Sequence, residues 1–187
     1  GKFSPEQKSI YDLLIEMYNH GESMLKPDIS YKEIHLSVCE LMVKGLIERG
    51  FMMGEAKEIV ELGAHALFMP HGLGHMLGLD VHDMENFGEE LVGYGGEKKS
   101  EQFGLKSLRL GRKLQEGFCL TLEPGIYFIP QLIDKWKKEE KFLEFINYEK
   151  LEEYKTFGGM RYEGDYVITK EGAKLLGGYR PRTAKEV

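Results

Sequence analysis

The stretch HGLGHMLGLDVHD, residues 71–83, holds three of the six histidines in this chain: His71, His75 and His82. Imidazole suits Zn, Mn, Fe or Co as a ligand, and the glycines between the histidines let the backbone approach a site closely. A lone histidine is more often a satisfied core residue, whereas this cluster favours a metal or active site. The surrounding segment, 68–104, keeps no helical or strand period, which is typical of function or disorder, and its apolar residues argue against disorder.

Two carboxylates in later segments could join these histidines. Glu123 ends an apolar run just before a predicted turn, where a glutamate either points to solvent or binds something, because burying it unpaired is costly. Glu163 lies two residues after Arg161 in a predicted strand, so the two share one face. They form either a surface ion pair or a carboxylate ligand with an arginine that orients it. Carboxylates with imidazoles suit a hard or borderline divalent ion such as Mn²⁺, and two such ions suit peptide hydrolysis.

The N-terminal third of the sequence predicts helices. Ser4-Pro5-Glu6-Gln7 has the capping-box pattern and precedes apolar residues at helical spacing, until Pro27 prevents the helix from continuing. Ser30 and Glu33 repeat the signature before a second helix, and residues 55–62 predict a third.

The C-terminal half predicts strands and further helix. Residues 118–129 predict a strand pair around a Pro-Gly turn, and residues 158–169 alternate as a strand does, with Gly164 marking a turn or bulge. Between them, residues 131–155 are charged and helical in composition, and residues 178–187 read as a tail. Because helices come first and strands later, the order favours an α+β fold.

Composition excludes several classes of protein. The 187 residues suffice for one domain, and 25 basic against 31 acidic residues give a net charge of −6, which argues against a general nucleic-acid binder. No apolar run approaches the ~18 residues of a membrane span, and the N-terminus lacks a signal-peptide pattern. Cys39 and Cys119 do not make a disulfide framework or a zinc site, so we expect buried thiols in a cytoplasmic protein.

Three segments, taken together, resemble the prolidases (Xaa-Pro dipeptidases), with aminopeptidase P as the near relative. They are FMPHGLGHMLGLDVHD at 68–83, LTLEPGIYF at 120–128 and GMRYE at 159–163. The resemblance spans essentially the whole chain, and three motifs in order are far more specific than any one. It implies the pita-bread (creatinase/aminopeptidase-like) fold, an α+β fold with helices packed on a curved antiparallel sheet, and a site for two metal ions, commonly Mn²⁺.

The resemblance also implies metal ligands. His75, Glu123 and Glu163 match ligands of the family, with Glu163 bridging both ions and Glu123 also discussed as the general base. Arg161 would lie beside Glu163 and orient its carboxylate without touching the metal ions.

Further residues match positions that contact the substrate. His82 matches the histidine that touches the substrate and stabilises the tetrahedral intermediate, and His71 matches a second catalytic histidine with a supporting role. Arg109 matches the arginine that holds the free carboxylate of a C-terminal proline, since guanidinium binds carboxylate bidentately.

The match to the family is incomplete. Its site has five ligands, of which two are aspartates upstream of the segment that resembles residues 1–4, and no aspartate of this chain fits that motif. We therefore expect residues 1–187 to be a single, partial catalytic domain, the C-terminal portion, without the N-terminal half and the upstream N-terminal domain. Such a chain would bind at most one divalent ion, weakly, would self-associate and would not turn over substrate alone.

Three functions stay open. The first is the C-terminal catalytic part of a metal-dependent proline dipeptidase that takes Xaa-Pro dipeptides, in a family where homodimers are common. The second is aminopeptidase P, which releases N-terminal residues from longer Xaa-Pro peptides; Arg109 and residues 131–155 favour the first. The third is a metal-free pita-bread module that binds proteins, which is compatible with the missing aspartates but gives no reason to keep His75, Glu123 and Glu163.

Overall fold

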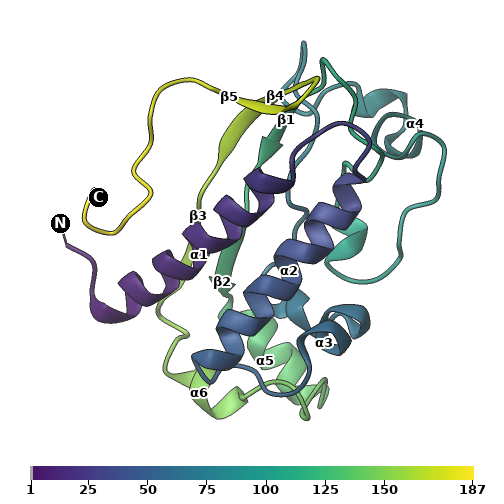
Figure 1. Cartoon of the computed structure of the whole chain (residues 1–187). Coiled ribbons are helices and arrows are strands. Elements are labelled where there is room, and N and C mark those ends of the chain that lie inside the picture. The colour runs from purple at the N-terminus through teal and green to yellow at the C-terminus, as the bar shows by residue number, and fades with distance from the viewer. Residues whose placement is uncertain (1) are drawn as a thin grey trace.

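Two long helices form one layer of the molecule, which a computed structural model describes over residues 2–187. Helix α1 (Pro5–Met24) begins with the predicted capping box: the Gln7 amide donates to Ser4 Oγ, and the Ser4 amide donates to the Gln7 side chain. Helix α2 (Tyr31–Glu48) follows, with the Ser30 amide donating to Glu33. The two helices lie side by side, and α1 also contacts β1, β2 and β3 (Figure 1).

Five strands form the second layer. All pairings are antiparallel, in the orders β1-β4-β5 and β2-β3. The expectation that residues 118–129 form a strand pair is therefore wrong in its pairing, because β1 pairs with β4 and β2 pairs with β3. The strands are β1 (Cys119–Leu122), β2 (Gly125–Phe128), β3 (Gly158–Arg161), β4 (Gly164–Thr169) and β5 (Gly172–Leu176).

β1 and β2 follow each other along one side of an antiparallel ribbon, and β3 and β4 along the other. Both sides are interrupted at facing residues. Leu122 pairs with Gly164 and Gly125 pairs with Arg161, so one register continues through the interruption. The predicted strand over 158–169 thus divides into β3 and β4, since Pro124 on the facing side has no amide to donate. Gly164 is a paired strand residue rather than a turn, and a side chain there would collide with the Tyr18 hydroxyl of α1.

Short helices connect the two layers. The predicted helix at 55–62 is confirmed as α3, and the helical composition of 131–155 resolves into α5 and α6. The long segment after residue 68 contains short helices that its lack of period did not reveal. These elements are α3 (Ala56–Leu62), α4 (Glu89–Tyr94), α5 (Pro130–Lys138), α6 (Tyr148–Glu152) and the 3₁₀ turns η1 (Ala64–Leu67), η2 (Glu85–Phe87) and η3 (Leu105–Ser107).

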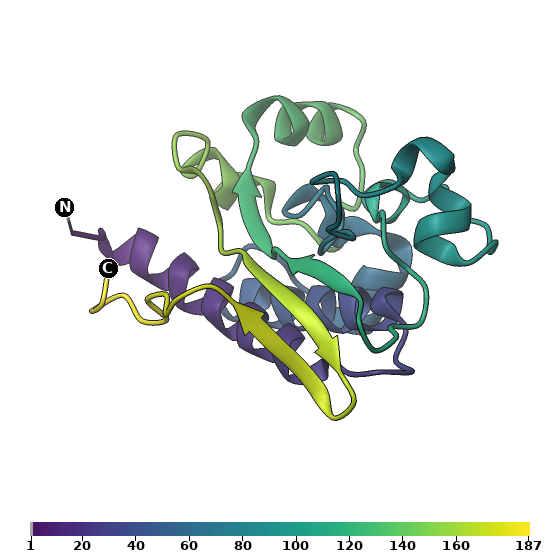
Figure 2. The same cartoon turned by 90° about the horizontal axis from the view of Figure 1, so that it is seen from above.

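The C-terminal stretch is not a free tail. It returns along α1 (Figure 2), where the Tyr11 hydroxyl donates to the Pro181 carbonyl at 3.0 Å. Arg182 Nη2 donates to Glu22 Oε1 at 2.8 Å, and its guanidinium lies over the Tyr18 ring at 5.2 Å. The interpretation of 178–187 as a tail overlooked these partners, which are distant in sequence.

One continuous cluster of buried apolar side chains joins the helices to the sheet. It includes Leu13 and Leu14 of α1, Met42 of α2, Leu122 of β1 and Phe128 of β2. Among residues 2–187, no helix is both long and apolar enough to cross a membrane.

Candidate metal centre

The stretch that begins at Leu73 runs antiparallel to β1 and continues the sheet on that side. The Thr121 amide donates to the His75 carbonyl at 2.9 Å, and the Glu123 amide donates to the Leu73 carbonyl at 2.7 Å. The His75 amide donates in turn to the Thr121 hydroxyl at 3.0 Å. This pairing explains why the segment is ordered without a period of its own, and it sets His75 beside the end of β1.

Gly74 makes this close approach possible. A Cβ atom at residue 74 would collide with the carbonyl oxygen of Thr121 and with the hydroxyl of Tyr31. Tyr31 is itself fixed, because its buried hydroxyl donates to the same Thr121 carbonyl at 2.6 Å. The glycine of the histidine-rich motif therefore has a steric role: it lets the backbone that carries His75 approach β1.

His75 and Glu123 meet inside the protein. Each is only 7% exposed, and His75 Nε2 lies 3.3 Å from Glu123 Oε1. His75 Nδ1 lies 2.9 Å from the Met76 carbonyl, an acceptor only, so Nδ1 carries the proton in the neutral ring. The lone pair of Nε2 therefore faces Glu123, which is the orientation that a metal-binding histidine needs.

Glu123 is held by two further side chains. Thr121 Oγ1 donates to Glu123 Oε1 at 2.9 Å, and Arg161 Nη1 donates to Glu123 Oε2 at 2.7 Å. Arg161 Nε also donates to the Tyr127 hydroxyl at 2.8 Å. Arg161 was expected behind Glu163, but its ion pair is with Glu123. The carboxylate is therefore fixed in orientation before any ion binds.

Glu163 occupies the position across the ribbon from Glu123. The register that pairs Leu122 with Gly164 and Gly125 with Arg161 sets the two glutamates opposite each other. Partial burial raises the pKa of Glu163, and the charge of Glu123 raises it further. Like charges at directly opposed positions destabilise a sheet, so this place favours a cation.

The ligand atoms of His75, Glu123 and Glu163 lie farther apart than the ligand atoms of a single bound ion would. Among residues 2–187, the group of three candidate ligand residues whose atoms all lie within 4.8 Å of one another is a different one, His35, Cys39 and His65. Glu163 is exposed, and its carboxylate has to come closer to His75 and Glu123 for the three to share an ion.

The other two histidines of the motif flank this pair. The exposed His82 ring stands perpendicular to that of His75, with 4.3 Å between ring centroids. The His71 ring packs edge-on against Tyr127 at 5.3 Å, its Nδ1 lies 2.8 Å from the Gly72 carbonyl, and burial lowers its pKa. His71 Nε2 is buried without a hydrogen-bond partner in the described chain. Buried polar atoms nearly always have a partner, so this nitrogen is free to bind a further group.

Arg109 lies next to His82, with Nη1 3.4 Å from His82 Nδ1, and forms an ion pair with Glu85. Arg109 and His71 line one groove of about 420 Å³, which also has two lysines in its wall. Arg109 and His71 thus lie at one open groove with charges of both signs, and His82 contacts Arg109 beside it. Its other lining residues are Glu85, Glu89, Lys99, Lys106 and Ser107.

Sequence reasoning did not single out Thr121, Tyr127 or Glu85 as part of this centre. The spacing of Thr121 and Glu123 was an available signal, because residues two apart in a strand share a face. Glu85 had no such signal, since it lies in an irregular segment and meets Arg109 through tertiary contact alone.

The donor set fits a divalent ion of the harder kind. It combines one imidazole lone pair with the oxygens of two carboxylates, Glu123 and Glu163, whose charges repel. Hard and borderline cations such as Mn²⁺ prefer these ligands, and a thiolate is not among them.

Comparison with known proteins agrees with this chemistry. A model of metallopeptidase family M24 matches residues 1–170. The human Xaa-Pro dipeptidase is 37% identical over 187 residues, which is all of this chain and 36% of that protein. A probable Xaa-Pro aminopeptidase of Talaromyces marneffei is 36% identical over 187 residues, again all of this chain and 38% of that protein. This chain therefore spans little more than a third of the length of these relatives.

Solved structures of aminopeptidase P are similar to this chain in fold. A variant of Escherichia coli aminopeptidase P in complex with substrate superposes with a TM-score of 0.72 and 30% identity, over 99% of this chain and 34% of that one. The zinc-substituted E. coli enzyme in complex with product gives a TM-score of 0.69 and 29% identity over the same shares. The α+β pita-bread fold and the resemblance to prolidases are confirmed, and the chain belongs to metallopeptidase family M24, a family of metal-dependent hydrolases.

Proposed function

We propose that this chain supplies the histidine and two glutamate ligands of a two-metal peptidase that cleaves the bond before the C-terminal proline of Xaa-Pro dipeptides. The observation that carries the proposal is the position of Glu163 opposite Glu123, with Nε2 of the buried His75 3.3 Å from Glu123. The likeness over the whole chain to the human protein named Xaa-Pro dipeptidase supports this substrate class.

His75, Glu123 and Glu163 would hold the metal, and Mn²⁺ is the ion that we propose, because the ligands are imidazole and carboxylate without thiolate. When bound, two such ions would supply a nucleophilic water at neutral pH and polarise the peptide carbonyl. The ion pair with Arg161 and the Thr121 hydroxyl would keep Glu123 in one orientation throughout.

The remaining residues would bind and orient the substrate. His82, on the exposed side of His75, would donate a hydrogen bond to the oxygen that gains charge in the tetrahedral intermediate. His71 lines the groove with an unpartnered Nε2 and would hold or pass a proton there. Glu123, as the buried base, would accept a proton from the attacking water.

Arg109 would bind the free carboxylate of the proline. It lies at a groove whose wall also carries Lys99 and Lys106, and its present partner, Glu85, is a carboxylate that a substrate carboxylate could replace. In the protein that carries these residues, Arg109→Gln is expected to raise KM for Gly-Pro about tenfold or more and to reduce the preference for Gly-Pro over Gly-Pro-Ala. Arg112→Gln, an arginine that stacks on Phe118 instead, is the matched control. An unchanged length preference in Arg109→Gln would remove the residue from this role.

A second candidate is the release of N-terminal residues from longer Xaa-Pro peptides. Two observations favour it: the superposition on aminopeptidase P structures, and the likeness to proteins named probable Xaa-Pro aminopeptidase. The same comparison of Gly-Pro with Gly-Pro-Ala distinguishes the two candidates, because an aminopeptidase P would prefer the longer peptide.

Residues 1–187 are proposed to be one partial catalytic domain, whose single apolar core supports its folding as a unit. Three ligands are too few for two ions, so we propose that the chain on its own binds at most one ion, weakly, without turnover. Full activity would need further carboxylates from a longer chain or a partner.

A homodimer is our proposal for the assembly. Large apolar side chains stand exposed between residues 79 and 91, and such patches typically mark contact surfaces. They are Leu79, Val81, Met84, Phe87 and Leu91. We also propose a cytoplasmic location, because Cys39 and Cys119 are both free thiols, as is usual in reducing compartments.

The direct test of the peptidase proposal is Glu163→Gln in the protein that carries these residues. Activity on Gly-Pro with Mn²⁺ is expected to fall by at least about a thousandfold, while Glu171→Gln, at an exposed glutamate near β5, should leave it unchanged. Near-normal turnover by Glu163→Gln would exclude the assignment.

A further inference from the structure

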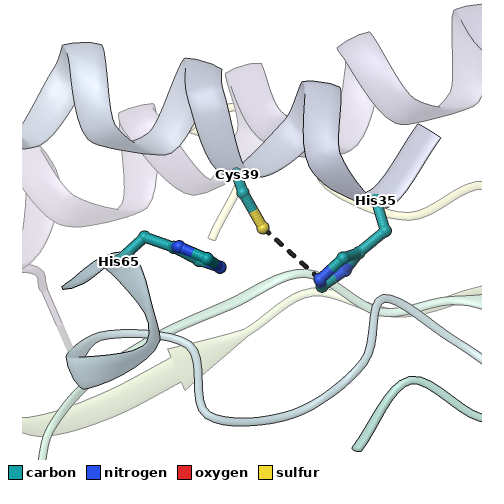
Figure 3. Close-up of side chains that lie close together, drawn as sticks. All are labelled: His35, Cys39 and His65. Carbon is teal, nitrogen blue, oxygen red and sulfur yellow. Dashed lines mark hydrogen bonds between the residues drawn. The ribbon is translucent and has the colours of Figure 1, made fainter. Parts of the chain in front are cut away.

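A second group of potential metal ligands lies inside the helical layer. His35 and Cys39 are one turn apart on α2, and His65 in η1 points toward them (Figure 3). Their ligand atoms all lie within 4.8 Å of one another, and none of the three side chains is more than 1% exposed. The centre described above uses none of these residues.

The polar atoms of this group lack partners. Nδ1 of His35 and both ring nitrogens of His65 are buried without a well-formed hydrogen bond to the described chain, and the backbone of Ile59 is the one partner near the His65 ring. The remaining contact is between His35 Nε2 and Cys39 Sγ at 3.6 Å. Buried polar atoms in folded proteins nearly always have a partner. An ion bound through one nitrogen of each ring would give a buried His65 nitrogen the partner that it lacks.

We propose that His35, Cys39 and His65 form a buried three-ligand site for a thiophilic metal ion, with Zn²⁺ as the ion and its fourth position left for a water. One thiolate and two imidazoles are the ligands that Zn²⁺ takes, whereas Mn²⁺ prefers oxygen. On binding, the Cys39 thiol releases its proton to solvent and the sulfur lone pair binds the ion, with no change in oxidation state. The two centres would thus hold different metals.

The three ligand atoms need to approach one another only slightly to bind one ion. Zn–S of about 2.3 Å and Zn–N of about 2.0 Å place tetrahedral ligand atoms roughly 3.3–3.6 Å apart. The His35–Cys39 pair is already at 3.6 Å, and ligand atoms within 4.8 Å of one another leave the His65 ring to move by about 1.5 Å at most.

The protonation states agree with this geometry. Burial lowers the pKa of His35 to about 3 and that of His65 to about 4, so both rings are neutral at pH 7 and offer a lone pair. Burial raises the pKa of the Cys39 thiol, so that thiol ionises only when a cation is present.

The test uses Co²⁺ as a probe of thiolate ligation, with excess Mn²⁺ present to occupy the oxygen-rich centre. Thiolate bound to Co²⁺ gives a charge-transfer band in the near ultraviolet, and that centre contains no thiolate. The band is expected to saturate near one equivalent in the unaltered chain and in Cys119→Ser, and to be lost in Cys39→Ser and His65→Gln. A band that persists in Cys39→Ser, or no band at all, would overturn the proposal.

A measurement on the unaltered chain covers the case in which the variants fail to fold. X-ray absorption of the chain loaded with one equivalent of Zn²⁺ and excess Mn²⁺ should show one sulfur scatterer at about 2.3 Å beside nitrogen scatterers. A shell of nitrogen and oxygen alone would contradict the site. Because the readout is the metal's environment, it is independent of peptidase activity.

Discussion

Glu163 stands directly opposite Glu123 across an antiparallel ribbon, in the register that pairs Leu122 with Gly164 and Gly125 with Arg161. Two like charges on one face of a sheet oppose folding. Two guanidiniums lie nearby: Arg161 bonds to the Glu123 carboxylate, and Arg180 bonds to the backbone carbonyl of Glu163 rather than to its carboxylate. The fold therefore holds a local conflict that a divalent cation between the two glutamates would resolve. This conflict, on a ribbon held in place by α1, is the strongest structural argument for the metal centre.

Arg161 should affect metal binding through Glu123. Arg161→Gln removes the bond that fixes Glu123 Oε2, and the loss of such outer partners typically weakens metal binding about 10- to 100-fold. We expect weakening of that order for Mn²⁺, measured by titration calorimetry. Tyr127→Phe removes only the bond to Arg161 Nε and should have the smaller effect. If both variants bind Mn²⁺ like the unaltered chain, Arg161 has no role in the centre.

Gly74 should not tolerate a side chain. Gly74→Ala would drive Cβ into the Thr121 carbonyl, a backbone atom that cannot turn away, so we expect a loss of about 1–3 kcal/mol in the free energy of unfolding. Gly178→Ala is the control, because the space around Gly178 is open. Urea denaturation of the two variants measures the difference. Equal stability would mean that the residues around His75 and β1 can separate at little cost.

Stability without metal should depend on pH through His35 and His65. Their pKa values are about 3 and about 4 in the folded chain, against 6.5 ordinarily. Below pH 6.5 the unfolded chain takes up protons that the folded chain refuses, so the free energy of unfolding falls as the pH falls. The fall is at most about 1.4 kcal/mol per pH unit for each histidine, and neither contributes above pH 6.5.

Urea denaturation in EDTA between pH 7 and pH 5 measures this slope. His65→Gln should show a shallower slope than the unaltered chain, while His20→Gln, at a partly buried histidine bonded to Ser37, is the matched control. An identical slope in His65→Gln and the unaltered chain would contradict the buried, neutral state of His65.

The C-terminal stretch should stabilise α1 through Arg182. This guanidinium bonds to the partly buried Glu22 and lowers its pKa, so Arg182→Gln is expected to cost about 1–2 kcal/mol at pH 7. Because the folded pKa of Glu22 is depressed, this contribution is present above pH 4.5 and is lost as the pH falls through the folded value. Lys8→Gln, which breaks an exposed pair with Asp12, should cost less than about 0.5 kcal/mol. If Arg182→Gln and Lys8→Gln cost equal free energy, residues 178–187 do not stabilise α1.

Local signals in the sequence predicted local structure well. The capping boxes at Ser4 and Ser30 placed the starts of both long helices, since their bonds span only three residues. The three motifs identified the family, and the structure brings His75 next to Glu123 as they implied. Residue spacing alone could not predict that these side chains meet, because the glutamates and the histidine come from separate segments.

Features that depend on distant partners were not predictable. The change of pairing partner at Pro124 divides one expected strand into two, and the contact of Arg182 with Glu22 crosses most of the chain. Arg161 bonds to Glu123, which lies on the facing side of the antiparallel pair and is 38 residues away in sequence, so spacing alone did not indicate this partner. The sequence offered no reason to expect a zinc site at the two cysteines, since His35 and Cys39 fall on the buried stripe of a helix and His65 joins them only in the fold.

Counting bound Mn²⁺ tests the metal centre most directly. The purified chain is incubated with excess Mn²⁺, free ion is removed, and bound metal per chain is counted for the unaltered chain, Glu123→Gln, Glu163→Gln and the control Glu171→Gln. We expect at most one weakly held ion in the unaltered chain and in the control, and a clear loss of binding in the other two variants. Two tightly held ions per chain, or binding undiminished in Glu123→Gln and Glu163→Gln, would contradict the centre described here.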